Sequence, residues 1–415
     1  MTIGELYELF DRLRPYRSRA AASILDNHLD TDESRACMTH APCRGALTEL
    51  TAALEILESL PGEGFQRELS VDGRDLSLTL DYEFRELRRD VVCLEEGMRG
   101  VARSLRVPGA FQEELSALQS LLATGRSSAD RYAAIFTDRD GTIANYCGRY
   151  RSSHQPLYAA VRIGRFARMC TDHFFVVTSG PLYGHGLLSL SAFPEATVHL
   201  AGSKGREYVL ADGSAGSFPL TDEQRSVIIA LDERIQALLE RPEYRVLTMI
   251  GSGYQRKFGQ LTVSRQDIHR SVPAEVSDGF LREVRRIVSE LDGRQEWFDL
   301  DDTGFDIEVT LVAEGGRKRG FHKGDGVAFL VKSLDLDLHR APVLVCGDTA
   351  SDVPMLEYLA EAGCETHAIF VATDGDLERR VRRVATRSAF CSGPDVLVAA
   401  LGISGRQEER NEYGT

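Results

Sequence analysis

The sequence predicts an α/β protein: a Rossmann-like parallel sheet with helices on both faces, an inserted smaller domain and an all-α domain ahead of both. Three observations predict this arrangement. Helical apolar stripes fill the first 125 residues, short apolar strands alternate with helices from residue 131, and a helix–strand–strand pattern occurs twice later in the chain. We therefore expect a helical domain at 1–125, a core at 131–215 and 316–405, and an inserted domain at 216–315.

The composition of the 415 residues is typical of a globular chain, because 43% are apolar and 27% are charged. The formal net charge of −14 argues against a nucleic-acid partner, since an acidic surface repels phosphate. No apolar run approaches the roughly 18 residues that cross a bilayer, and the acidic start does not resemble a signal peptide. We expect a cytoplasmic protein with no membrane partner and with reduced cysteines.

The N-terminal domain is predicted to be helical because its apolar residues recur every three or four positions. A second stripe, from Phe111 to Leu122, follows a break at Val107-Pro108-Gly109, so we expect the two helices to fold back as an antiparallel hairpin. These stripes serve packing, either within the chain or between the subunits of a homo-oligomer. The longest stripe has the spacing of a coiled-coil seam and comprises Leu80, Phe84, Leu87, Val91, Leu94, Met98, Val101 and Leu105.

Three apolar strands of the core are predicted at 132–136, 173–177 and 342–345, each ending in polar residues. Open parallel sheets bind their ligands at the carboxyl ends of the strands. We therefore expect the polar residues that follow these three strands to share one site.

The inserted domain is predicted to form a small antiparallel sheet above the core, as a lid. We expect its elements to be a helix at 222–239, strands at 244–250 and 257–263, a helix at 274–291, and strands at 296–300 and 305–311.

Two pairs of carboxylates carry the clearest chemical signal. Asp138 and Asp140 follow the first strand in the motif DxDGT, where one can act as a nucleophile and the other can transfer a proton. Asp348 and Asp352 follow the last of the three strands with the spacing GDxxxD. Acidic strand ends placed side by side repel one another unless a cation lies between them, and their hard oxygen atoms favour Mg²⁺.

Three further residues are suited to binding an anionic group. Ser179 offers a hydroxyl and Gly180 a backbone amide at the end of the second strand, while Lys323 supplies positive charge. The chain has only five lysines, so lysine at Lys204 and Lys257 is also informative.

Taken in order, the DxDGT, Ser-Gly, Lys-Gly and GDxxxD elements resemble the haloacid dehalogenase superfamily over residues 132–401. The inserted domain is similar to the type C2 cap of that superfamily, with the order αββαββ. The resemblance implies that Asp138 forms a phospho-aspartyl intermediate and that Asp140 protonates the leaving group. It also implies that Ser179 and Lys323 hold the phosphoryl oxygens.

The same resemblance implies a bound Mg²⁺ as cofactor. Its ligands would be the carboxylate of Asp138, the main-chain carbonyl of Asp140 and the carboxylate of Asp348, with Asp352 in support.

Within the superfamily the sequence looks most like the trehalose-6-phosphate phosphatases, in the segments 200–205, 253–257, 306–309 and 322–324. This implies that Gly180, Lys204, Lys257 and Glu308 contact the substrate. The implied function is a Mg²⁺-dependent phosphatase acting on a sugar phosphate, either trehalose 6-phosphate or a related disaccharide or glycoside phosphate.

Two alternatives stay open. A phosphomutase of the superfamily shares this plan and would return the phosphoryl group to the sugar. A catalytically silent fold carried on a helical scaffold is the other alternative.

Overall fold

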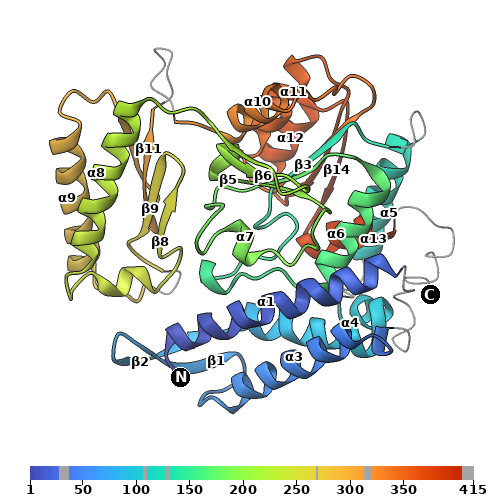
Figure 1. Cartoon of the computed structure of the whole chain (residues 1–415), viewed down its shortest axis with the longest axis horizontal. Helices are drawn as coiled ribbons and strands as arrows, with labels where there is room; N and C mark the ends of the chain where they lie inside the picture. The colour runs from blue at the N-terminus through green and yellow to red at the C-terminus, as the bar shows by residue number, and fades with distance from the viewer. Residues whose placement is uncertain (28–36, 106–109, 127–130, 268–269, 313–319, 404–415) are drawn as a thin grey trace.

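The computed structural model describes residues 1–27, 37–105, 110–126, 131–267, 270–312 and 320–403. Its centre is an eight-stranded sheet in the order β14-β13-β12-β3-β4-β5-β6-β7, parallel from β14 to β5 and antiparallel at β6 and β7 (Figure 1). This confirms the predicted α/β fold. The strands are β3 (Ala134–Thr137), β4 (Phe174–Val177), β5 (His199–Gly202), β6 (Glu207–Val209), β7 (Ala215–Ser217), β12 (Val343–Gly347), β13 (Thr366–Val371) and β14 (Arg387–Cys391).

The central strands are buried on both faces, which explains their continuous apolar sequences. In β3, Ile135 packs into one core cluster while Ala134 and Phe136 pack into another, because successive side chains of a strand point to opposite faces. The first cluster includes α6 (Leu157–Cys170) and α13 (Pro394–Ile403). The second includes α10 (Lys323–Ser333), α11 (Val353–Glu361) and α12 (Gly375–Val384).

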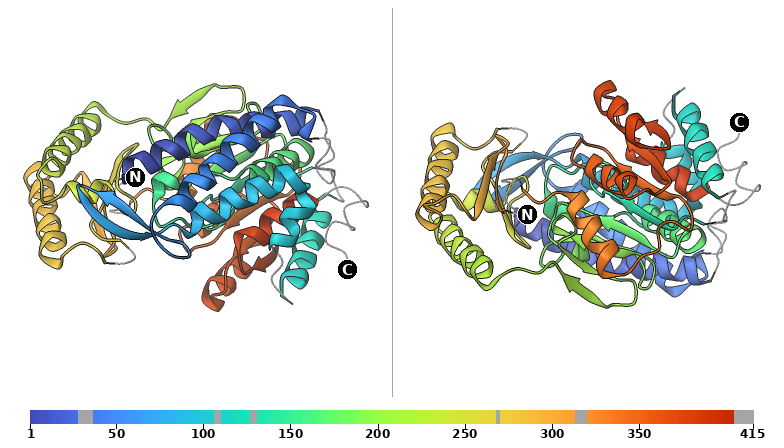
Figure 2. Two further views of the ribbon diagram at one scale, coloured as in Figure 1. Left: turned by 90° about the horizontal axis from the view of Figure 1, so that it is seen from below. Right: turned by 90° about the horizontal axis from the view of Figure 1, so that it is seen from above.

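The N-terminal helices cover one side of this core, packing against α6. They are α1 (Ile3–Asp26), α3 (Ala41–Ser59) and α4 (Asp81–Leu105), and α1 and α4 both contact α3 and α6 (Figure 1, Figure 2). The predicted seam lies along α4 and is buried within the chain, apart from the half-buried Val91. The stripe therefore serves packing inside the chain.

The N-terminal region is not all-α as predicted, because a β-hairpin separates α3 from α4. Its strands are β1 (Gln66–Val71) and β2 (Arg74–Thr79). The turn residues Asp72 and Gly73 have φ of 48° and 75°, the left-handed geometry that a two-residue hairpin turn requires.

The predicted fold-back of the second helix along α4 is wrong. That helix, α5 (Ala110–Arg126), packs on α13 and β14 at the edge of the core. Its apolar residues Phe111, Leu115 and Leu118 are buried there. The side chain of Glu114 also accepts a hydrogen bond from the backbone N–H of Ser392 at 3.0 Å.

Residues 222–311, which we call the cap, form a four-stranded antiparallel sheet of order β10-β11-β9-β8 beside the core (Figure 1, Figure 2). Its two helices lie on the sheet face directed away from the core. The elements are α8 (Asp222–Leu239), β8 (Tyr254–Lys257), β9 (Gln260–Ser264), α9 (Ala274–Leu291), β10 (Phe298–Asp302) and β11 (Asp306–Leu311).

The strand predicted at 244–250 is wrong, because Arg245–Thr248 form a 3-10 turn. Leu247 is buried in the cap core from this turn, and Gly251 and Gly253 then reverse the chain with positive φ. The first strand of the cap begins only at Tyr254 and pairs with β9 through the tight turn at Phe258 and Gly259.

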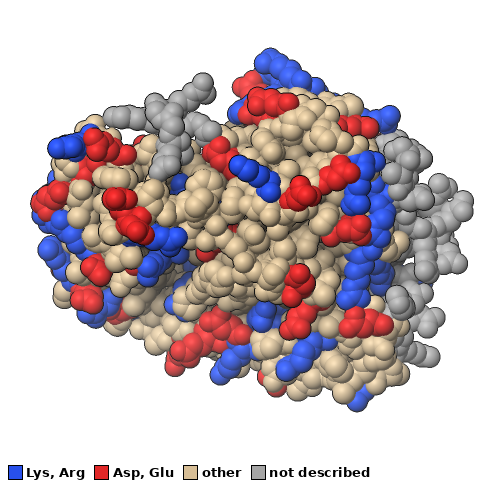
Figure 3. All heavy atoms as spheres, turned by 45° about the horizontal axis from the view of Figure 1, so that its top comes forward, with Lys and Arg blue, Asp and Glu red and all other residues tan. Residues whose placement is uncertain are grey.

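Acidic and basic side chains are mixed over the face of core and cap in Figure 3, with one row of basic side chains at its right-hand edge. Within the described ranges, no helix is both long enough and apolar enough to cross a membrane.

Candidate active site

Asp138 lies immediately after β3, and its buried carboxylate meets the ammonium group of Lys323. The backbone N–H of Asp138 donates to the carbonyl of Cys346 at 2.9 Å, which fixes the end of β3 against β12. Lys323 is the first residue of α10 and also donates to Asp352 Oδ1 at 2.6 Å. Three segments that are distant in sequence therefore meet at one ammonium group.

Asp352 organises the loop that follows β12. Its Oδ2 accepts the backbone N–H groups of Asp348 and Thr349, both at 3.0 Å, so the loop turns back on itself. Thr142 of the DxDGT motif bridges the two strand ends, since its hydroxyl lies 3.2 Å from Asp138 Oδ2 and 3.5 Å from Asp348 Oδ1. These contacts hold the acidic residues that follow β3 and β12 close to one another.

Asp138, Asp348 and Asp352 form a cluster that fits a divalent cation. Each offers one carboxylate oxygen, and these three oxygens lie within 4.8 Å of one another. Burial raises the pKa of Asp138 to about 8 and that of Asp348 to about 7, and repulsion from neighbouring carboxylates adds to both shifts. A cation among these hard oxygens would keep the carboxylates ionised at neutral pH, and Mg²⁺ suits such ligands.

Asp140 lies beside this cluster but its side chain is not part of it. Its carboxylate remains partly accessible and forms an ion pair with Arg139, Nη1 to Oδ1, at 2.5 Å. The Arg139 guanidinium also donates to the backbone carbonyl of Ser153. Asp140 is thus held at the mouth of the site with one face open to a bound molecule.

A cleft of about 220 Å³ opens between the core and the cap above these residues. From the core it is lined by Asp138, Asp140, Ser179, Gly180 and Lys323. The cap contributes the following polar side chains: Ser252, Gln255, Lys257, Thr262, Asp306 and Glu308. The site therefore combines an acidic end in the core with a polar roof from the cap.

Three of the four residues predicted to contact a substrate, Gly180, Lys257 and Glu308, line this cleft. Lys204 is not among the lining residues but lies next to Glu308. Lys257 is buried on β8, and burial lowers its pKa to about 8. Glu308 on β11 accepts a hydrogen bond from Gln260 at 2.9 Å and lies 3.8 Å from the ammonium group of Lys204. Lys204 is positioned through its backbone, which donates to the carbonyl of Thr178 at 2.8 Å, next to Ser179 and Gly180.

Two tyrosines of the site were not predicted from the sequence. Tyr146 donates its hydroxyl to Asp348 Oδ2 at 2.6 Å, and Tyr150 lines the cleft. Both lie in the irregular segment after the DxDGT motif, where no periodic pattern marks their direction. Only their closeness in sequence to Asp140 could have suggested them.

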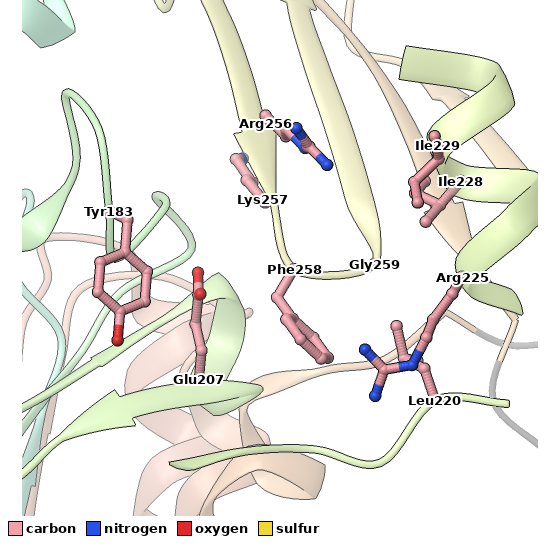
Figure 4. Close-up of a pocket in the computed structure, with 10 residues that line it drawn as sticks. All are labelled: Tyr183, Glu207, Leu220, Arg225, Ile228, Ile229, Arg256, Lys257, Phe258 and Gly259. Atoms are coloured by element: carbon pink, nitrogen blue, oxygen red, sulfur yellow. The ribbon is translucent and has the colours of Figure 1, made fainter. Parts of the chain in front are cut away.

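A second hollow lies behind the turn that joins β8 and β9. Figure 4 shows Phe258 of this turn between Tyr183 and Glu207 on the core side and Arg225 of α8 on the other. Arg206, next to Glu207, donates to the carbonyl of Gly259 at 2.8 Å and to that of Leu311 at 3.1 Å. A core side chain therefore fastens two strands of the cap.

Residues 135–397 match the family described as trehalose-6-phosphate phosphatase, C-terminal. A trehalose-phosphatase of Brugia malayi is 31% identical over 390 residues, covering 85% of this chain and 78% of that protein. A trehalose-phosphatase of Caenorhabditis elegans is 37% identical over 274 residues, covering 64% of this chain and 62% of that protein.

Longer relatives also match this chain. The UDP-forming alpha,alpha-trehalose-phosphate synthase 2 of Caenorhabditis elegans is 35% identical over 282 residues, and this chain spans only 23% of its length. Among solved structures, the C-terminal domain of the Candida albicans trehalose-6-phosphate phosphatase aligns with a TM-score of 0.46 at 15% identity, covering 68% of this chain and 96% of that domain.

Proposed function

Because this chain belongs to the trehalose-6-phosphate phosphatase family, we propose that it is a Mg²⁺-dependent phosphatase that hydrolyses trehalose 6-phosphate or a related disaccharide or glycoside phosphate. The observation that carries the proposal is the buried contact of Asp138 with Lys323, beside Asp348 and Asp352 and beneath the polar roof of the cap. In this proposal one cleft holds the nucleophile Asp138, its positively charged partner Lys323 and the carboxylates that would bind the metal ion.

In the proposed reaction, Asp138 attacks the phosphorus atom and the bond from phosphorus to the sugar oxygen breaks. Asp140 donates a proton to the departing sugar oxygen, then takes one from the water that hydrolyses the phospho-aspartate. Lys323 and Ser179 bind the phosphoryl oxygens, where they offset the charge of the transition state. Asp138, Asp348 and the carbonyl of Asp140 would hold Mg²⁺, supported by Asp352, and the ion would neutralise charge on the phosphoryl group.

The cap, which we propose to be of type C2, would select the sugar. Glu308 and Lys257 are charged groups on the cap side of the cleft, opposite the proposed catalytic acids, where sugar hydroxyls would lie. Lys204 of the core lies 3.8 Å from Glu308 and would assist it there. Enclosure between cap and core would also exclude bulk water from the acyl phosphate.

Phosphate release from a panel of sugar phosphates, including trehalose 6-phosphate, tests the proposal, with Asp138→Asn as the blank. We expect stoichiometric release that requires Mg²⁺ and is absent from the variant. Isomerisation of a sugar phosphate without release would identify a mutase instead. No turnover of any phosphomonoester by the wild-type protein would refute both activities.

A further inference from the structure

The segment 145–157, which joins the DxDGT motif to α6, is held by one face of the N-terminal helix α4. Glu83, Glu86 and Asp90 lie on this face, because residues three, four or seven positions apart share a side of a helix. All three carboxylates are buried. Each binds a different part of the segment, so the N-terminal region reaches the neighbourhood of the cleft.

Glu83 holds the centre of the segment. It forms a buried ion pair with Arg149, whose Nη2 lies 2.9 Å from Oε1 and 3.1 Å from Oε2. The same carboxylate accepts the hydroxyl of Ser152 at 2.6 Å. Two donors on one buried carboxylate fix the backbone on either side of Tyr150.

The other two carboxylates hold the ends of the segment. Glu86 accepts the side-chain amide of Asn145 at 3.2 Å, immediately before Tyr146. Asp90 accepts the backbone N–H of Leu157 at 2.6 Å and the guanidinium of Arg17 at 2.6 Å, at the start of α6 and away from the cleft. Glu83 and Glu86 are therefore the members of the set that support the part of the segment facing the site.

Tyr150 is the residue that this support places at the cleft. Its hydroxyl oxygen is buried and has no hydrogen-bond partner among the described residues. It lies against the backbone of Gly180, since a Cβ atom added to that glycine would come within 2.2 Å of it. A buried hydroxyl without a partner is costly, and an oxygen of a bound molecule would satisfy it.

We propose that α4 is a positioning element of the active site: Glu83 and Glu86 hold residues 145–153 so that the Tyr150 hydroxyl donates a hydrogen bond to an oxygen of the bound sugar phosphate. This role of Tyr150 rests on the proposed function, whereas the support of the segment by α4 does not. In this proposal the N-terminal helices have two roles: they cover the core, and α4 positions a segment of its active site.

The test compares Glu83→Gln with Asp90→Asn, which weakens a buried ion pair on the same face of α4 but remote from the cleft. We expect both variants to lose stability. Only Glu83→Gln should increase amide hydrogen exchange across residues 145–153 and lower kcat/KM for the sugar phosphate, by about tenfold. Unchanged exchange in that segment would overturn the positioning role, even if the wild-type protein releases no phosphate.

Tyr150→Phe tests the hydroxyl itself without disturbing the segment. We expect unchanged hydrogen exchange and an approximately tenfold loss of kcat/KM, the size expected for a hydrogen bond to a charged oxygen. Wild-type kcat and KM in Tyr150→Phe would refute the contact. If Glu83→Gln does not fold, Glu86→Gln replaces it, with exchange at Asn145 and Tyr146 as the readout.

Discussion

Lys323 and Asp352 form a buried ion pair in which Nζ lies 2.6 Å from Oδ1, although Lys323 is the first residue of α10 and Asp352 is the N-cap of α11. The same ammonium group donates to Asp138. Charge balance in the core of the site therefore depends on one lysine, whose side chain is only 3% exposed.

Lys323→Met should both inactivate and destabilise the protein. The change leaves Asp138 and Asp352 buried without their cation, which costs about 3–5 kcal/mol when a buried pair is broken. Urea unfolding measures the stability and phosphate release measures the activity. Lys332→Met, at an exposed position near the end of the same helix, is the control and should alter neither. Wild-type stability of Lys323→Met would contradict this account of the pair.

Mg²⁺ should raise the melting temperature of the wild-type protein but not that of Asp348→Asn. Three neighbouring carboxylates favour the folded, ion-bound state, and a ligand at 100 times its Kd adds about 2.7 kcal/mol of stability. Thermal unfolding with and without a chelator is the measurement. Asp337→Asn, an exposed carboxylate ahead of β12, provides the control. An equal response of Asp348→Asn and the wild-type protein would remove Asp348 from the metal site.

Glu308→Ala should raise KM for the sugar phosphate while leaving hydrolysis of p-nitrophenyl phosphate, which carries no sugar, nearly unchanged. Glu308 lies on the cap side of the cleft and would contact the sugar only, so its loss should cost about 1–3 kcal/mol of binding. Steady-state kinetics on both substrates measure the difference. Asp299→Ala, exposed on β10, is the matched control. An equal loss on both substrates would argue against a role in reading the sugar.

The sequence allowed the carboxylates of the proposed active site to be predicted because they follow apolar strands, and residues at the ends of parallel strands lie at one edge of the sheet. Asp138 and Asp348 follow apolar strands of a parallel sheet, and such strands bring their carboxyl ends to one edge. Tyr146 and Tyr150 could not be predicted in this way. Their segment has no regular period, and its course is set by Glu83 and other long-range contacts.

The same distinction applies to the errors in the fold. The hairpin at 66–79 carries only a short local signal, the turn dipeptide Asp72-Gly73, between two strong helical stripes. The packing of α5 on α13 carries no local signal, because an apolar stripe specifies that a face is buried but not which element covers it.

Arg206→Met should loosen the cap without harming the core. The guanidinium donates to the carbonyls of Gly259 and Leu311 and lies 4.3 Å from the ring centroid of Phe321, so its loss frees the turn next to Lys257. We expect a higher KM for the sugar phosphate and an unchanged rate with p-nitrophenyl phosphate. The control is Arg225→Met, an exposed residue of α8 that lines the hollow behind the turn between β8 and β9 (Figure 4). Unaltered KM in Arg206→Met would show that the cap is held by other contacts.

His154 should make the stability of the protein depend on pH between about 6.5 and 4. Its ring is buried beside Asp11 of α1, and burial lowers its pKa to about 4, against about 6.5 in an unfolded chain. Between these values the unfolded state binds the proton and the folded state does not, so stability falls as the pH falls. At about 1.4 kcal/mol per pH unit, the total loss is about 3 kcal/mol.

Urea unfolding of His154→Gln at pH 7 and pH 4 isolates this contribution, since glutamine keeps a polar atom near the position of Nε2 and does not titrate. The wild-type protein should lose about 3 kcal/mol more than the variant between the two pH values. His339→Gln, exposed ahead of β12, is the control for removing a surface histidine. Because Tyr82 donates to the backbone carbonyl of His154, the main chain there should stay in place in the variant. Parallel losses in His154→Gln and the wild-type protein would assign the acid sensitivity to the carboxylates instead.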